Sequence, residues 1–128
     1  MKTVKKVSVK RRFSSPGVDS ASLFKDIADF LDGCKAEDIV SIDLKGKSSV
    51  ADFLIIATGR SQPHLKSTAD KLKDFLLEKG IKNISIEGLV HCDWVLVDAG
   101  DIVIHIFRPE IREFYNLEKM WGPSFSDT

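Results

Sequence analysis

The sequence predicts an α/β (or α+β) fold in which a mixed β-sheet of about five strands carries helices packed on it. Three observations support this class. The continuous apolar run Phe53–Ala57 is typical of a strand buried on both faces. A turn and then an amphipathic helix follow that strand, an order typical of α/β folds. Further along, two apolar strands flank a glycine-containing turn and lead into another helix.

Composition indicates one ordinary globular domain. The chain has 128 residues, 43% of them hydrophobic and 30% charged. No apolar stretch approaches the ~18–20 residues of a membrane span. The two cysteines, Cys34 and Cys92, lie far apart in the sequence, so we expect free thiols, a reducing compartment and a cytoplasmic location.

Charge divides the chain into an arm and a body. Residues 1–16 carry six basic side chains and no acidic one, whereas the remaining residues carry 13 basic and 19 acidic side chains. We predict a basic flexible arm over residues 1–19, a folded domain over 20–122 and a frayed tail over 123–128. For the arm, RNA contact and an organelle transit segment remain alternatives to simple disorder. The acidic body argues against nucleic-acid binding by charge alone and permits a basic protein partner.

The first half of the domain reads as a helix followed by two strands. A helix is expected over residues 21–33, capped by Asp19 or Ser20 and ended by Gly33 as the C′ residue. Strands are expected over Ile39–Leu44 and Ala51–Thr58.

The second half begins with a helix that Ser61 or Gln62 opens and Gly80 ends. Its apolar side chains recur at helical spacing, which predicts one buried stripe. A short strand, Ile84–Glu87, follows, and Pro109 suits the first turn of the last helix. The stripe consists of Leu65, Ala69, Leu72 and Leu76.

A hairpin is expected between these elements. Its strands, Trp94–Val97 and Ile102–Phe107, flank the sequence Asp98-Ala99-Gly100-Asp101. With Ala99-Gly100 as a two-residue loop, paired residues have numbers that sum to 199. Val95 and Val97 then face a core, whereas the other face pairs Trp94 with His105 and Asp98 with Asp101. Two opposed carboxylates repel each other, so this face is either kept for a partner or, with Trp94, buried under a helix.

The search for reactive groups predicts no catalytic, cofactor or metal site. The turn at Gly59 lies between a strand and a helix but belongs to neither common phosphate-loop motif. No His or Cys pair has metal-ligand spacing. The remaining signal is a group of aromatic residues. We expect Phe107 and Phe114 in the core, and leave Trp94, Tyr115 and Trp121 open between core and interface.

Several blocks of the chain, from about Ser20 to Gly122, resemble the ribosomal silencing factor family, also called Iojap. The resemblance is specific because two of the blocks occur together at the family's separation. They are Asp93-Trp94-Val95-Leu96-Val97-Asp98 with Gly100-Asp101, His105 and Phe107, and Phe114-Tyr115 with Leu117-Glu118 and Trp121-Gly122. Other matching residues include Asp43-Leu44, Lys47-Ser48-Ser49, Ala51-Asp52-Phe53, Ile56-Ala57-Thr58-Gly59 and Glu87-Gly88.

The resemblance implies a function that spacing alone does not. Such proteins bind the large ribosomal subunit through a basic ribosomal protein on its joining face, block association with the small subunit and so repress translation. The family is not one of enzymes, its fold is nucleotidyltransferase-like, and its members commonly form homodimers. A minor contact of residues 1–16 with ribosomal RNA is compatible with this function. The residues implied in partner binding are Trp94, Val95, Asp98, Asp101, Tyr115 and Glu118.

One alternative comes from a different class. It is a nucleotidyltransferase-like enzyme that uses Asp98, Asp101 and the turn at Gly59. Such an enzyme needs carboxylates clustered for Mg²⁺ beside the phosphate-binding turn.

Overall fold

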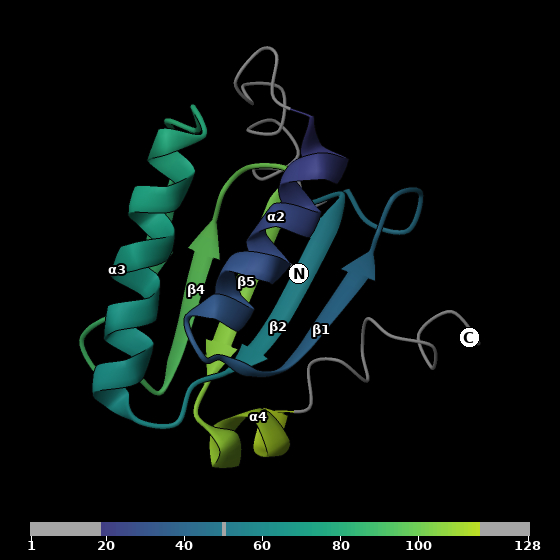
Figure 1. Cartoon of the computed structure of the whole chain (residues 1–128). Helices are drawn as coiled ribbons and strands as arrows, with labels where there is room; N and C mark the ends of the chain where they lie inside the picture. Colours follow the sequence, from purple (N-terminus) through teal and green to yellow (C-terminus); the bar gives the residue numbers. More distant parts are fainter. Residues whose placement is uncertain (1–18, 50, 116–128) are drawn as a thin grey trace.

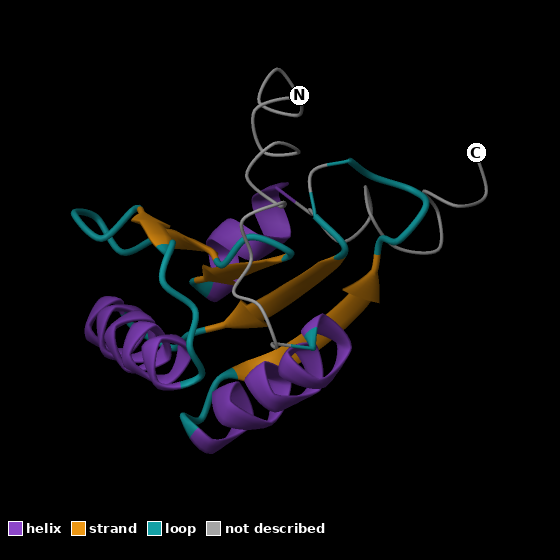
Figure 2. Cartoon of the chain, turned by 90° about the horizontal axis from the view of Figure 1, so that it is seen from above, coloured by secondary structure: helices purple, strands orange, loops and turns teal. Residues whose placement is uncertain are grey.

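The computed structural model describes residues 19–49 and 51–115. A five-stranded sheet in the order β1-β2-β5-β4-β3 forms its centre. Helices α2 and α3 cover one face of this sheet, and the short helix α4 lies at one end of the other face (Figures 1 and 2). The elements are α2 (Ser20–Gly33), β1 (Glu37–Asp43), β2 (Phe53–Thr58), α3 (Gln62–Glu78), β3 (Ser85–Glu87), β4 (Trp94–Asp98), β5 (Ile102–Phe107) and α4 (Pro109–Tyr115).

The sheet is mixed, as the sequence predicted. β2 and β5 run parallel, whereas β1 with β2, β4 with β5 and β3 with β4 are antiparallel. All six residues of β2 are buried, which confirms that this strand is covered on both faces. The long connection through α3 is what allows β2 and β5 to run parallel.

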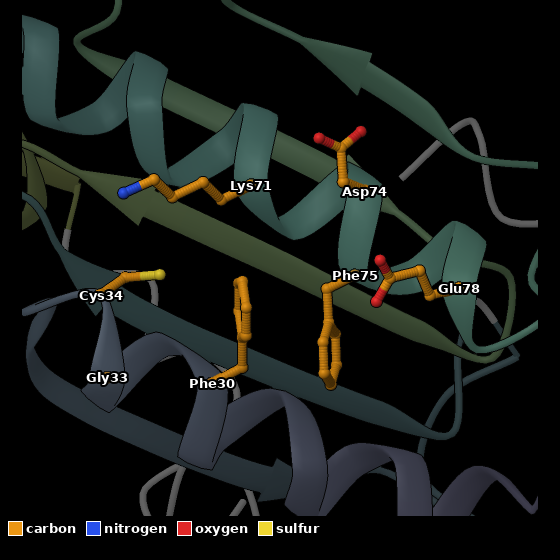
Figure 3. A pocket seen from close by; sticks show the side chains of 7 residues that line it. All are labelled: Phe30, Gly33, Cys34, Lys71, Asp74, Phe75 and Glu78. Carbon is orange, nitrogen blue, oxygen red and sulfur yellow. The ribbon is translucent and has the colours of Figure 1, made fainter.

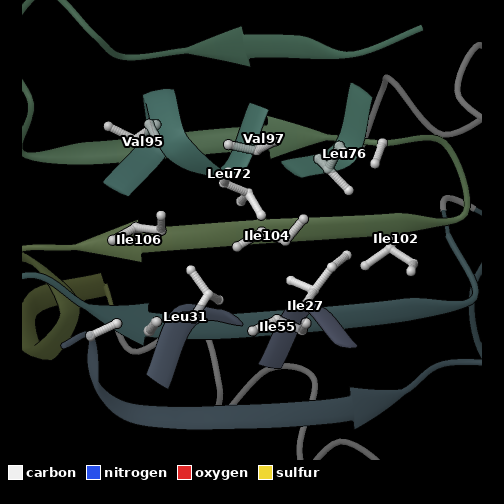
Figure 4. Packing of buried hydrophobic residues seen from close by; sticks show 14 of the residues in the cluster. Ile27, Leu31, Ile55, Leu72, Leu76, Val95, Val97, Ile102, Ile104 and Ile106 are labelled. Carbon is white, nitrogen blue, oxygen red and sulfur yellow. The ribbon is translucent and has the colours of Figure 1, made fainter. Parts of the chain in front are cut away.

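The main core lies between the sheet and the helices α2 and α3. The predicted stripe on α3 is confirmed, because Leu65, Ala69, Leu72 and Leu76 are fully buried. Ile27 and Leu31 of α2 pack beside them. Figure 4 shows the helical side chains of Ile27, Leu31, Leu72 and Leu76 over the sheet. Beneath them lie aliphatic residues of β2, β4 and β5, among them Ile55, Val95, Val97 and Ile104.

The end of α2 differs from the prediction. Gly33 is the last helical residue rather than the C′ residue, and Lys35, with φ of 70°, takes the left-handed conformation. The amide of Ala36 donates to the carbonyl of Leu31 and the amide of Lys35 donates to that of Asp32, both at 3.0 Å. These two hydrogen bonds form a Schellman motif with Lys35 as the C′ residue, two residues after the glycine that was expected in that role.

The register of the hairpin also corrects the prediction. The numbers of paired residues sum to 201, because Trp94 lies opposite Phe107 and Leu96 opposite His105. The two-residue loop is Gly100-Asp101, with Gly100 at φ of 91°, as a turn with a left-handed first position requires. A shift of two residues leaves each side chain on its predicted face, because the side-chain period of a strand is two.

Candidate interaction surface

The face of the sheet opposite α2 and α3 carries a second apolar cluster. Its middle is formed by Trp94, Leu96, His105 and Phe107, which we call the Trp94 face. Trp94, Leu96 and His105 are half-buried, whereas Phe107 is fully buried. Among the described elements only α4 lies over this side of the sheet, at the end where β5 finishes (Figure 2). Apolar side chains that keep partial exposure on a sheet face are suited to a partner.

Three aromatic rings hold one another on this face. The Trp94 indole stacks on Phe107 with ring centroids 4.9 Å apart and an interplanar angle of 26°. The imidazole of His105 lies 5.9 Å from Phe107 at 16°. The indole Nε1 of Trp94 donates a hydrogen bond to Nδ1 of His105 at 2.9 Å. Both other rings therefore stack on the buried Phe107, and Trp94 is held by this stack and by its hydrogen bond to His105.

His105 is a neutral acceptor in this arrangement. An indole N–H can only donate, so Nδ1 of His105 must be unprotonated. Burial disfavours the charged imidazolium and lowers the pKa of His105 from 6.5 to about 4. Both effects keep the proton off Nδ1 at neutral pH.

The expected like-charge pair does not exist. In the observed register Asp98 lies opposite Val103 rather than Asp101. Asp98 accepts a hydrogen bond at Oδ1 from the amide of Gly100 at 2.9 Å, and Asp101 accepts one at Oδ2 from Ser20 Oγ at 2.8 Å. The prediction of two opposed, uncompensated carboxylates was therefore wrong, because the turn lies one residue further along the chain than expected.

Of the other predicted contact residues, Val95 is the one whose side chain the structure places away from the surface. It is 0% exposed and packs in the main core, on the face covered by the helices. Tyr115 is the last residue of α4, whereas Glu118 and Trp121 lie outside the described residues. Phe107 is in the core as expected, but Phe114 is 79% exposed, so its core assignment was wrong.

Arg112 anchors α4 to the sheet. Its side chain is buried, and its Nη1 donates to the carbonyl of Asp38 and, at 2.7 Å, to Oγ1 of Thr58. Hydrophobic spacing cannot identify such a residue, because a cation on a short helix usually faces solvent. Arg112 thus ties the helix bordering the Trp94 face to β1 and β2.

Glu87 is a second residue that sequence reasoning missed. It pairs with Leu96 in the register of β3 and β4 and is exposed. Paired residues of neighbouring strands point to the same side of a sheet, so Glu87 places a carboxylate at the rim of the Trp94 face. The alternation of side chains along β3 could have placed Glu87 on one face of the sheet. Only the pairing with β4 shows that it lies beside Leu96.

The residues of the alternative enzyme site are not brought together. Asp101 precedes β5 and its carbonyl accepts from the amide of Phe53, at the start of β2. Gly59 follows the other end of β2, six residues away, which corresponds to about 20 Å of extended strand. Across residues 19–49 and 51–115 no group of three or more His, Cys, Asp and Glu side chains could hold a metal ion. The geometry therefore lacks the juxtaposition that this alternative requires.

A hollow of about 460 Å³ lies between α2 and α3. Figure 3 shows Phe30 and Phe75 side by side in it, and their rings stack with centroids 4.3 Å apart. Burial raises the pKa of the Cys34 thiol, and the neighbouring Lys71 opposes this shift. A thiol with a raised pKa is a weak nucleophile, so the hollow gives no sign of thiol chemistry.

In the described part of the chain, no helix is long and apolar enough to cross a membrane.

Comparisons with known proteins assign the family. The family model described as ribosomal silencing factor during starvation matches residues 18–128. The chain is 49% identical over 111 residues to a ribosomal silencing factor of Zymomonas mobilis, covering 87% of this chain and 84% of the relative. It is 36% identical to the mouse protein named mitochondrial assembly of ribosomal large subunit protein 1, covering 72% of this chain and 42% of that protein.

A solved structure shows the same fold. The crystal structure of a protein from Chromobacterium violaceum is similar with a TM-score of 0.74 and 34% sequence identity, covering 79% of this chain and 85% of that one. The expected likeness to nucleotidyltransferases stays a prediction. The family match covers most of the chain, and the fold is that of a family structure, so the chain belongs to the ribosomal silencing factor family.

Proposed function

We propose that this protein binds the large ribosomal subunit through a basic ribosomal protein on its joining face. Bound there, it blocks association with the small subunit by steric exclusion and so represses translation. The mechanism requires occupancy rather than turnover, so repression follows the fraction of subunits that carry the protein.

The observation that carries this proposal is the half-buried Trp94 held on the fully buried Phe107. Interface hot spots are enriched in tryptophan, and a side chain that is ordered before binding loses less entropy when the partner binds. The family name of the bacterial relative and the large-subunit name of the mouse relative support the ribosome as the target.

Charge supports a basic partner. The chain outside the first 16 residues has an acidic excess, and Glu87 places a carboxylate beside Leu96 on the Trp94 face. Rim charges of this kind speed encounter and make binding depend on salt. Asp98 and Asp101 remain proposed contacts, although each already accepts a hydrogen bond within the protein. Tyr115 and Glu118 also remain proposed contacts.

The test is co-sedimentation with separated ribosomal subunits. We expect Trp94→Ala to weaken binding to the large subunit about 30-fold, since a hot-spot truncation costs about 2 kcal/mol or more. Leu77→Ala is the matched control, because Leu77 is 47% exposed on α3, over the opposite face of the sheet. Urea unfolding of each variant separates lost contact from lost stability. Normal binding by a folded Trp94→Ala variant would show that the Trp94 face is not the binding surface.

Three further expectations belong to this function. We propose a homodimer, which light scattering of the free protein tests, and a cytoplasmic location, with an organelle as the alternative if residues 1–19 are a transit segment. We also propose that residues 1–16 make at most a minor contact with ribosomal RNA. Deletion of that arm should then leave most of the large-subunit binding intact in the same sedimentation assay.

A further inference from the structure

The stack on Phe107 alone does not fix the orientation of Trp94. A stack holds the plane of the indole but allows the ring to slide, or to turn over and present its other edge. Trp94 is also the first residue of β4, so the chain before it does not continue the strand. A polar contact at one ring atom does select a single orientation.

The hydrogen bond to His105 supplies that contact. His105 lies opposite Leu96, so it is the diagonal neighbour of Trp94 on the same face of the hairpin. The bond joins Trp94 Nε1 to His105 Nδ1 at 2.9 Å, while the two ring centroids are 5.8 Å apart and tilted by 42°. The distance is that of a well-formed N–H hydrogen bond, and the tilt shows that the contact is edge to edge rather than a second stack.

We propose that His105 is a positioning residue that holds the Trp94 indole in its partner-binding orientation by accepting the indole N–H at Nδ1. This inference rests on the proposed function, because it assigns Trp94 to the partner surface. It adds that affinity depends on a side chain that orders Trp94 before the partner arrives. Ordering the anchor in advance lowers the entropy lost on binding.

The state of the imidazole agrees with this role. With Nδ1 as acceptor, the neutral ring carries its proton on Nε2. Protonation would place an N–H at Nδ1 against the indole N–H and abolish the bond. Since burial lowers the pKa of His105 to about 4, the bond persists throughout the neutral range. The stacked Phe107 beneath both rings keeps His105 from turning freely.

Two variants of His105 differ in where they place an acceptor. The amide oxygen of asparagine reaches about the position of Nδ1, whereas that of glutamine reaches about the position of Nε2. His105→Asn should therefore preserve the bond and His105→Gln should break it, although both replacements are polar and neutral. The readout is the indole N–H resonance of Trp94 in a ¹H–¹⁵N spectrum. The chain has two tryptophans, so Trp121→Phe identifies the signal.

We expect His105→Gln to move the Trp94 indole resonance, speed its exchange with solvent and weaken large-subunit binding about fivefold. That factor corresponds to the roughly 1 kcal/mol of a typical hydrogen bond. His105→Asn should retain the slow solvent exchange of the wild-type indole N–H and the wild-type affinity. In a Trp94→Phe background, which has no indole donor, the two His105 variants should bind equally, because His105 acts through Trp94.

The outcomes separate the two proposals. His105→Gln could shift the resonance and still bind like the wild type, in which case His105 does not act by positioning Trp94. The same conclusion follows if His105→Gln weakens binding as much in the Trp94→Phe background as in the wild-type background. Failure of His105→Asn to bind better than His105→Gln overturns the positioning role in the same way. Normal binding by Trp94→Ala instead overturns the proposed surface itself, whatever the spectra of the His105 variants show.

Discussion

Acid should destabilise this protein through His105 in a defined pH range. The folded-state pKa of His105 is about 4, below the 6.5 of an unperturbed histidine. Between these values the unfolded chain binds a proton that the folded protein excludes, so lowering the pH favours unfolding. The contribution of His105 is fully present above pH 6.5, declines as the pH falls and is lost near pH 4. Each tenfold difference in proton affinity corresponds to about 1.4 kcal/mol, so the total loss is about 3 kcal/mol.

The assay is urea unfolding of the wild type and of His105→Asn at several pH values between 4 and 7.5. Asparagine does not titrate, so the difference between the two unfolding free energies isolates the His105 contribution. The contributions of groups that both proteins share cancel in that difference. We expect the advantage of the wild type over the variant to shrink by about 1.5 kcal/mol between pH 6.5 and 5. A difference that stays constant over this range would refute the assignment of His105 as a histidine kept neutral by burial.

Two further predictions concern the supports of the Trp94 face. Gly88 has φ of +93°, and a Cβ there would lie 2.2 Å from the carbonyl oxygen of Trp94. Gly88→Ala should therefore cost more than about 2 kcal/mol of unfolding free energy. Gly33→Ala is the control, because a Cβ at this helical position would meet no atom within 4 Å, and it should be neutral or slightly stabilising. If the two glycine variants changed the thermal unfolding equally, the reasoning would be contradicted. Arg112→Met should cost about 1–3 kcal/mol, because it leaves the partners of a buried cation unpaired. Hydrogen exchange should then speed up in α4, and unchanged protection there would show that Arg112 does not anchor it.

The described helices and strands were largely predictable because their signals are local. The α3 stripe recurs every three or four residues, and the apolar run of β2 needs no partner to be recognised as buried. The helix α2 ends at Gly33 as expected, but the C′ role was assigned to the wrong residue. The Schellman motif uses Lys35 in the left-handed conformation, which a non-glycine residue adopts only when neighbouring hydrogen bonds support it.

The candidate site was only partly predictable. Trp94 and His105 were expected on one face, which the alternation of the strands determines. Their hydrogen bond was not expected as such, because it depends on a register that the turn at Gly100-Asp101 decides. Asp98 and Asp101 were expected to repel each other, but in the observed register they do not lie opposite one another, and each accepts a hydrogen bond within the protein.

The sequence by itself determined which side chains share a face, which runs form helices and strands, and to which family the blocks are similar. These properties depend on periodicity and on the order of residues, both of which can be read along one chain. Only the tertiary structure decided which groups meet: the indole of Trp94 with His105, the buried Arg112 with Thr58, and Glu87 beside Leu96. The physical reason is that hydrogen bonds and ion pairs act over about 3 Å, and a register shift of two residues moves a strand by about 7 Å while leaving its hydrophobic pattern unchanged.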